Sequence, residues 1–398
     1  MERLLQHSPG STIRVLTNEG DALRRFCPQA EAVSLRGWDG WRKAKVLPRW
    51  LCREAEQGWR RRNSALYWRL WSAKATIFRG KYLAGLEFLH ELDRADAFVM
   101  AGCGMLNDCF RDSSLRVLAL LEFAINRGLF TALLSQGVGP MEDSVLRDRA
   151  AEVMPRVDSI FIREEPTTNP LLKRLNVSPE RVFFTGDDAL EIGLHAGKNE
   201  RGNNLGFNLR LSNYSGVSGD TVGSVRCALV KKAEREGALL RATPITRDSA
   251  DCDMATARAI LAGLGGAHDA GEELDTPSKV ARRIGECRIV VTGSYHVAVF
   301  ALAQGVPAVC VAGNDYYRAK FTGLADKFGD GCVVVPANKA GFQERLSETI
   351  DRLWEEAPRV RESLRQEASR QCELGRAGYA RLSSRLLGRA AGAAGARR

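Results

Sequence analysis

Apolar and polar residues alternate along the chain in blocks that predict short buried strands separated by amphipathic helices. The first series of strands is expected at residues 12–17, 32–35, 97–101, 130–134, 159–162 and 181–184, with a basic helical stretch reaching to about residue 93. The polar run HAGKNERGNN then predicts a linker. A second series of strands is expected at residues 205–209, 238–241, 288–291, 308–311 and 332–335. Amphipathic helices follow from about Gly341 and end in a tail that we expect to fray.

Strands that alternate with helices in this way predict an α/β fold with parallel sheets. We expect two Rossmann-like domains that face a cleft. The N-terminal domain covers residues 1–194, the linker residues 195–204, and the C-terminal domain with its C-terminal helices residues 205–398. Ligands of such sheets bind beyond the carboxyl ends of the strands, so the loops that follow the strands are where function is expected.

The composition excludes several classes of protein. The 398 residues are 44% hydrophobic and 27% charged, as in an ordinary globular protein. We see no secretory signal pattern and no uncharged apolar run long enough to span a membrane. The ten cysteines form no CxxC motif, and none has a histidine at metal-ligand spacing. They predict reduced core residues of a cytoplasmic protein without a metal site.

The net charge of +10 is concentrated in one window. Residues 36–81 hold 13 Lys or Arg against three acids, and six of the seven tryptophans. The simplest interpretation is a helical insertion whose tryptophans pack on their own domain. The same residue types suit an anionic membrane surface or a lipid-linked substrate, where indoles lie at headgroup depth. Nucleic acid is not expected as a partner, because no nucleic-acid-binding module accompanies the window.

Several of the loops after the strands contain residues suited to binding. Gly102 and Gly104, in GCGMLND, would let the backbone approach a ligand closely. SQGVGP follows the next strand. Arg163 ends the third, where a surface salt bridge is the competing interpretation. TGDDAL supplies Asp187 and Asp188, and Arg210 follows the first strand of the second series.

His296 is the most informative candidate. It follows the turn Thr292-Gly293-Ser294, in the first turn of an otherwise apolar helix whose N-terminus would point into the cleft. A positive helix end lowers the pKa of an imidazole, so this histidine can exchange a proton near neutral pH. The same N-terminus suits a phosphate. A hydrogen-bonded structural histidine is the alternative.

These motifs together resemble the polysaccharide pyruvyl transferase family. The matching segments, spread over residues 96–329, are DAFVMAGCGMLND, LLSQGVGP, VDSIFIREEPT with LLKRLNV, TGDDAL, TGSYHVAVFALAQGVPAV and NDYYRAKFTGLADKFG. The resemblance implies a glycosyltransferase-B-like pair of Rossmann domains. It also implies transfer of the enolpyruvyl carbons of phosphoenolpyruvate to two hydroxyls of a sugar, which forms a cyclic pyruvate ketal and releases phosphate.

The resemblance assigns roles to the candidates. His296 matches the histidine of the family and is expected to be the general acid/base. Phosphoenolpyruvate is the co-substrate, and no other cofactor and no metal is expected. The acceptor would be a cell-surface glycan, an exopolysaccharide or their lipid-linked precursor, met at the inner face of the cytoplasmic membrane. Candidates for the donor phosphate and carboxylate are Arg163, Arg210, Arg318, Lys320, Gly102, Gly104 and Ser294. Asp187, Asp188 and Gln136 are candidates for the acceptor.

The chain departs from the family pattern in two places. Members often have an arginine two residues before the histidine, where this chain has Ser294; Arg318 or Lys320 is expected to replace that charge. Members also open with a strand and a G-N-x-G-D turn. Here MERLLQHSPGS resembles the last turns of the helix that follows, so our hypothesis is a mis-assigned start or a truncated chain, and a first sheet that lacks one strand.

Two other functions remain open at this stage. A nucleotide-sugar glycosyltransferase of the same fold usually has a carboxylate near the GVP turn, and no Asp or Glu occurs between Thr292 and Asn314. A non-catalytic glycan-binding protein would explain Ser294 and the missing first motif.

Overall fold

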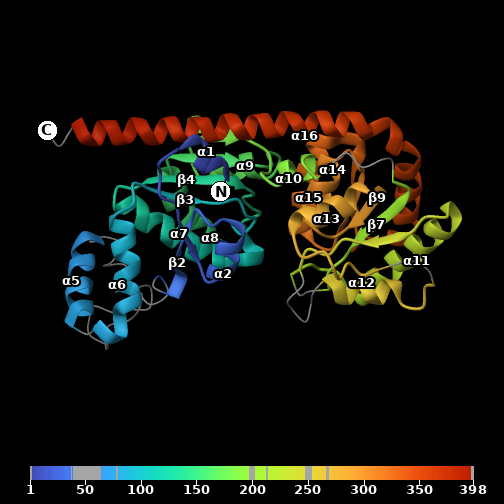
Figure 1. Ribbon diagram of the computed structural model, residues 1–398, viewed down its shortest axis with the longest axis horizontal. Helices are drawn as coiled ribbons and strands as arrows, with labels where there is room; N and C mark the ends of the chain where they lie inside the picture. Colours follow the sequence, from blue (N-terminus) through green and yellow to red (C-terminus); the bar gives the residue numbers. More distant parts are fainter. Residues whose placement is uncertain are drawn as a thin grey trace.

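The computed structural model describes residues 2–36, 38, 64–77, 79–196, 202–211, 214–246, 253–265 and 269–395. Much of the basic, tryptophan-rich window, residues 39–63, and half of the expected linker, residues 197–201, therefore lie outside the described residues. The described chain forms two α/β bodies that lie side by side under one long helix (Figure 1).

The N-terminal body is built on a parallel sheet in the order β3-β4-β5-β6. Its strands are β3 (Ala97–Met100), β4 (Phe130–Gln136), β5 (Ser159–Ile162) and β6 (Val182–Phe184). The connecting helices are α7 (Arg111–Asn126), α8 (Ser144–Val153) and α9 (Thr168–Arg174). All seven residues of β4 are buried, because helices cover both faces of such a sheet.

The first two strands stand apart from this sheet. β1 (Arg14–Thr17) and β2 (Glu31–Ser34), joined through α2 (Gly20–Phe26), form their own two-stranded parallel sheet. A short helix α1 (Glu2–His7) precedes them, and α5 (Ser64–Ile77) and α6 (Arg79–Asp93) follow. Trp38 and Trp71 are only 3% and 1% exposed and pack in one apolar cluster with Phe88 of α6. For these two tryptophans, packing on their own domain is the observed arrangement.

The C-terminal body holds a five-stranded parallel sheet in the order β11-β10-β9-β7-β8. Its strands are β7 (Asn204–Asn208), β8 (Leu240–Ala242), β9 (Cys287–Thr292), β10 (Ala308–Ala312) and β11 (Cys332–Pro336). The main helices are α11 (Gly219–Glu236), α12 (Asp253–Leu261), α13 (Pro277–Gly285), α14 (Tyr295–Ala303) and α15 (Asp315–Phe328). The strand order reverses between β9 and β7, and that position is where ligands of doubly wound sheets bind.

The C-terminal segment differs from the expectation of several helices and a frayed tail. It forms one 54-residue helix, α16 (Phe342–Gly395), with Pro358 inside it. Proline removes a backbone hydrogen bond and kinks a helix, and Figure 1 shows α16 bending near its start before it runs across both bodies. Tyr379 and Leu382 pack on Phe130 and Phe161 of the N-terminal sheet. This part of α16 therefore packs with the N-terminal body.

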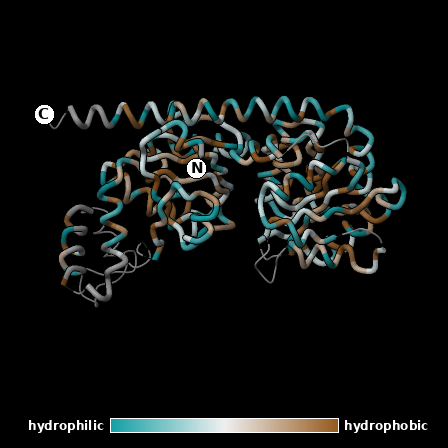
Figure 2. The backbone as a smooth tube through the Cα atoms, viewed as in Figure 1, coloured by the Kyte–Doolittle hydropathy of each residue, from teal (hydrophilic) through white to brown (hydrophobic). Residues whose placement is uncertain are grey.

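The strands carry the hydrophobic cores of both bodies, as the brown stretches at their centres show (Figure 2). Eight cysteines among the described residues are free, and five of them are buried. No helix in the described part of the chain is long and apolar enough to cross a membrane.

Candidate active site

His296 is placed by a short turn at the end of β9. The Ser294 backbone N–H donates to Thr292 Oγ1 (2.9 Å), and Ser294 is the N-cap of α14 in an extended conformation. Eight of the nine residues of α14 are buried, and His296 is the exception. Its imidazole reaches solvent although protein surrounds most of it. A polar, accessible side chain in the first turn of a buried helix is the arrangement that the sequence predicted.

A buried ion-pair cluster lies beside this turn. Arg163 follows β5, and its guanidinium contacts Glu164 (Nε to Oε2, 2.9 Å) and Asp187 (Nη1 to Oδ2, 2.8 Å). All three side chains are at most 7% exposed. The guanidinium also lies over the ring of Tyr295, 4.3 Å from its centroid. Arg163 was expected at the rim of a cleft; it is instead a buried cation that holds the two bodies together.

Lys320, on α15 of the C-terminal body, lies at the contact between the two bodies. Its Nζ donates to the Tyr316 hydroxyl (2.8 Å), which in turn donates to the carbonyl of Gly104 (2.8 Å) in the N-terminal body. Its ammonium also lies over the rings of Tyr295 and Tyr316, 5.0 and 4.6 Å from their centroids. Burial lowers the pKa of Lys320 to about 7, and the nearby Arg163 contributes to the shift.

The glycines of the N-terminal loop are needed for close approach. A Cβ on Gly104 would lie 2.6 Å from Lys320 Nζ and 2.9 Å from Arg163 Nη2. A Cβ on Gly102 would lie 2.8 Å from the Cβ of Ser135 and 2.9 Å from its carbonyl oxygen. Side chains at these positions would push the loop away from β4 and from the two cations, so the GCG motif brings backbone groups to the site.

Charge from both bodies acts on His296. Burial is the largest cause that lowers the pKa of this imidazole below its ordinary value, and the positive charges of Arg163 and Lys320 lower it further. Asp187 opposes them. His296 is therefore neutral at pH 7, with a carboxylate nearby that can stabilise the protonated form.

Arg210 follows β7 at the same edge of the C-terminal sheet as the turn that carries His296. Its guanidinium is already paired with other side chains. Its Nε contacts Asp253 (2.6 Å), and its other nitrogens donate to Tyr214 and Thr246. Asp253 also accepts from Asn208 and from two backbone N–H groups at the end of β8. Arg210 thus fixes the loops beyond β7 and β8, while its charge still acts on His296.

Three further candidates lie elsewhere. Arg318 is half-exposed and pairs with Asp315 (3.0 Å), so Lys320 rather than Arg318 supplies the cation near Ser294 and His296. Asp188 accepts from Tyr379 of α16 (2.6 Å) and faces Arg3. Gln136 is fully buried and donates to the carbonyl of Ala101 (2.8 Å), where it supports the glycine loop.

Sequence reasoning missed Glu164, Tyr295, Tyr316 and Asp253. Glu164 and Tyr295 each stand next to a named candidate in the chain, and their roles come from contacts between the two bodies. Tyr316 and Lys320 are four residues apart, about one helical turn. This spacing was the one signal in the sequence that their side chains would be in contact.

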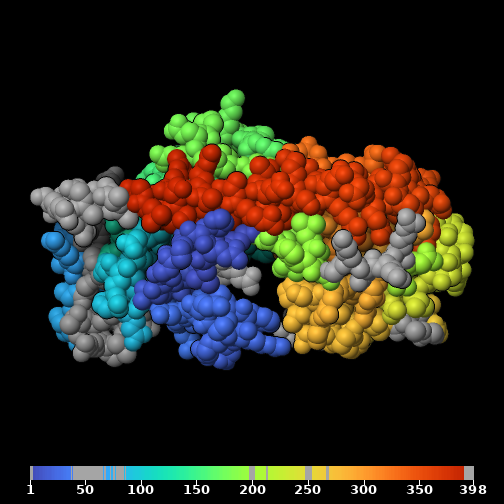
Figure 3. Space-filling model, turned by 45° about the horizontal axis from the view of Figure 1, so that its top comes forward, coloured from blue at the N-terminus to red at the C-terminus, as the bar shows by residue number. Residues whose placement is uncertain are grey.

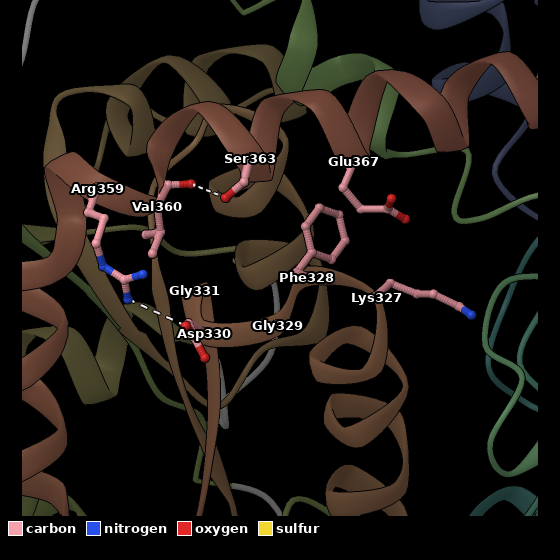
Figure 4. Close-up of a pocket in the computed structure, with 9 residues that line it drawn as sticks. All are labelled: Lys327, Phe328, Gly329, Asp330, Gly331, Arg359, Val360, Ser363 and Glu367. Atoms are coloured by element: carbon pink, nitrogen blue, oxygen red, sulfur yellow. Dashed lines mark hydrogen bonds and ion pairs between the residues drawn. The ribbon is translucent and has the colours of Figure 1, made fainter.

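A separate pocket lies between the end of α15 and α16 (Figure 4). Its volume is about 260 Å³, and it shares no residue with the site around His296. Arg359 and Asp330 form an exposed ion pair at one end of it (3.4 Å), and Lys327 and Glu367 lie at the other end (Figure 4). This mixture of charges does not select for an anion.

Elsewhere, Figure 3 shows a recess between the two bodies beneath α16. In the described part of the chain no group of three His, Cys, Asp or Glu could hold a metal ion.

Solved structures with a similar fold include glycosyltransferases and an epimerase. The glycotransferase of kitacinnamycin is 14% identical, with a TM-score of 0.54 over 97% of this chain and 94% of that chain. UDP-GlcNAc 2-epimerase from Neisseria meningitidis bound to UDP-GlcNAc is 11% identical, with a TM-score of 0.56 over 97% and 95%. Spinosyn rhamnosyltransferase SpnG is 13% identical, with a TM-score of 0.51 over 94% and 93%. These likenesses confirm the glycosyltransferase-B-like α/β fold.

The sequence itself matches one family. A search among curated proteins finds no match. The sequence pattern of polysaccharide pyruvyl transferases, however, matches residues 20–315 and takes in the glycine loop, the Arg163 strand, TGDDAL and the His296 turn. Because this match spans well over half of the chain, the protein belongs to the polysaccharide pyruvyl transferase family.

Proposed function

We propose that the protein transfers the enolpyruvyl carbons of phosphoenolpyruvate to two hydroxyls of a sugar, forming a cyclic pyruvate ketal and releasing phosphate. The observation that carries the proposal is His296, the one exposed residue of α14, beside a lysine whose pKa is about 7. Membership of the family supports the same reaction. The acceptor would be a cell-surface glycan, an exopolysaccharide or a lipid-linked precursor, which would place the enzyme at the inner face of the membrane.

The donor is an anion and would bind where backbone N–H groups and accessible cations meet. The first turn of α14 has free N–H groups beside the Ser294 hydroxyl, which makes no cap hydrogen bond. Lys320 adds a positive charge when it is protonated. Arg163 is already paired with two carboxylates, so it would act by holding Tyr295 and Asp187 in place rather than by contacting phosphate.

The chemistry requires protons to move at two places. A proton added to the methylene carbon of the donor creates an oxocarbenium-like centre, and a sugar hydroxyl attacks this centre. The carbon–oxygen bond to phosphate then breaks, and the second hydroxyl closes the ring. Of the two hydroxyl protons, one balances the new methyl group and the other leaves with phosphate. His296, neutral at pH 7 and near Asp187, is suited to accept and return these protons.

One assay tests the proposal against the other two functions. The full chain is incubated with phosphoenolpyruvate and a panel of bacterial glycans, and phosphate release is followed together with the mass gain of a ketal. Release of phosphate without a ketal product would contradict the proposal. Turnover of nucleotide sugars instead would assign the protein to the glycosyltransferases, and binding of glycan with neither reaction would make it a binding protein.

The proposed donor site predicts a pH dependence of KM. Lys320 is protonated below its pKa of about 7, and only that form attracts the anionic donor. We therefore expect KM for phosphoenolpyruvate to rise as the pH increases from about 6.5 to 8.5 around this pKa. Initial rates measured across this range give the profile.

Two variants at Lys320 test whether its deprotonation, and not that of another group, causes the rise in KM. Arginine stays charged throughout the range, so Lys320→Arg should keep KM flat with pH, whereas Lys320→Met should give a high and equally flat KM. If the wild-type profile survives in Lys320→Met, another group causes it. Arg318→Met is the matched control, because this half-exposed cation is already paired with Asp315.

A further inference from the structure

The α5 helix carries an apolar stripe that no described part of the chain covers. Leu66, Leu70 and Ile77 are 50%, 44% and 75% exposed. Their spacing of four and seven residues places them on one face of the helix, and Ala73, also exposed, lies between them on that face. Trp71 points away from this face, is 1% exposed and anchors α5 to the N-terminal body. The helix thus has a fixed inner face and an apolar outer face.

The position and charge of α5 indicate what could cover this stripe. α5 lies at the edge of the N-terminal body farthest from the C-terminal body (Figure 1). The window around it, residues 36–81, carries 13 Lys or Arg against three acids. Arg69 is exposed next to Leu70. The α5 helix itself contains no Asp or Glu. Exposed apolar side chains beside a cation complement a surface that is apolar beneath an anionic layer.

We propose that the outer face of α5, formed by Leu66, Leu70, Ala73 and Ile77, docks on an anionic lipid bilayer. The two leucines and the isoleucine would enter the headgroup boundary, and Arg69 would meet acidic headgroups. A stable interface with a second copy buries about 1,200–2,000 Å², which is far more than these few side chains offer. This inference concerns a surface apart from His296, and it stands whether or not the transfer reaction is the one proposed.

Vesicle co-sedimentation with the full chain tests the proposal. We expect binding to vesicles of phosphatidylcholine with phosphatidylglycerol, weak binding to phosphatidylcholine alone, and a decrease as salt is raised. The triple variant L66Q/L70Q/I77Q should lower the partition coefficient about tenfold or more, because its three side chains no longer favour the apolar layer. Leu387→Gln is the matched control, since Leu387 is 68% exposed on α16 between arginines and lies outside the proposed surface.

A second pair of variants keeps the test independent of folding. Ala73 is exposed within the stripe, so a longer charged side chain there should leave the fold intact. Ala73→Glu should weaken binding to the anionic vesicles, whereas Ala73→Lys should preserve or strengthen it. Equal binding by the two variants, equal binding to neutral and anionic vesicles, or no binding at all would overturn the proposal. Self-association that the triple variant abolishes, without vesicle binding, would assign the face to a second copy and overturn it equally.

Discussion

Replacing His296 with alanine is expected to lower kcat for ketal formation by about 10²–10⁴-fold, the usual range for loss of a general acid/base. The imidazole is the one exposed side chain of α14, so its removal should leave the packing of that helix unchanged. The nearby cations Arg163 and Lys320 would remain in place. The loss should therefore appear in kcat, with little change in the affinity for phosphoenolpyruvate.

Steady-state kinetics with an acceptor in excess would measure the effect, and the temperature of unfolding would confirm that the variant folds. His296→Gln serves as a second variant, because its amide keeps hydrogen bonds but cannot exchange a proton in this range. Full activity in both variants would remove His296 from the mechanism. A large rise in KM with unchanged kcat would show that it binds the donor and does not transfer protons.

Replacing Arg163 with methionine should have the largest effect on stability. The change leaves Glu164 and Asp187 buried without their counter-charge, and breaking such a pair costs about 3–5 kcal/mol of the free energy of unfolding. It also removes the guanidinium from the ring of Tyr295, so contact between the two bodies should weaken. Urea denaturation at pH 7 would measure the loss. Arg318→Met, which breaks an exposed pair, should change stability by no more than about 1 kcal/mol.

The sign of the pH dependence distinguishes an electrostatic loss from a packing loss. In the wild type, burial raises the pKa of Asp187, but Arg163, together with His296 and the backbone N–H of Ala189, outweighs burial and holds the pKa below its ordinary value. The pair therefore stabilises the fold at neutral pH, and this contribution is lost as the pH falls through the folded-state pKa. Without Arg163, only His296 and the backbone N–H of Ala189 still oppose burial, so this pKa rises. The destabilisation by Arg163→Met should thus shrink as the pH is lowered from 7 towards 5, whereas a loss of packing alone would stay constant.

The sequence predicted the elements well where local pattern decides them. Ser159–Ile162 is the strand that the apolar run indicated, and the Thr-Gly-Ser turn does place His296 at the start of a helix. The glycine loop and the family were likewise readable, because they depend on residues that are close in the chain. The pattern did not show that α16 is one helix, since Pro358 is a helix breaker in most contexts.

What the sequence did not show depends on contacts between distant segments. Arg163 has the same local pattern whether it ends in solvent or between Glu164 and Asp187, and only the meeting of the two bodies buries it. Lys320 was one of four cations proposed for the donor. Its place over two tyrosine rings, which sets it apart from the half-exposed Arg318, comes from the docking of α15 against the glycine loop.

The long α16 helix has a consequence for synthesis of the chain. Tyr379 and Leu382 lie near the end of the sequence, yet they cover apolar side chains of β4 and β5 in the half of the protein that leaves the ribosome first. Chains are made from the N-terminus at about 5–20 residues per second, and domains generally fold as units as they emerge. One face of the N-terminal sheet therefore remains uncovered until translation is almost complete. The N-terminal body, although synthesised first, can therefore complete its packing only after the end of α16 has been made.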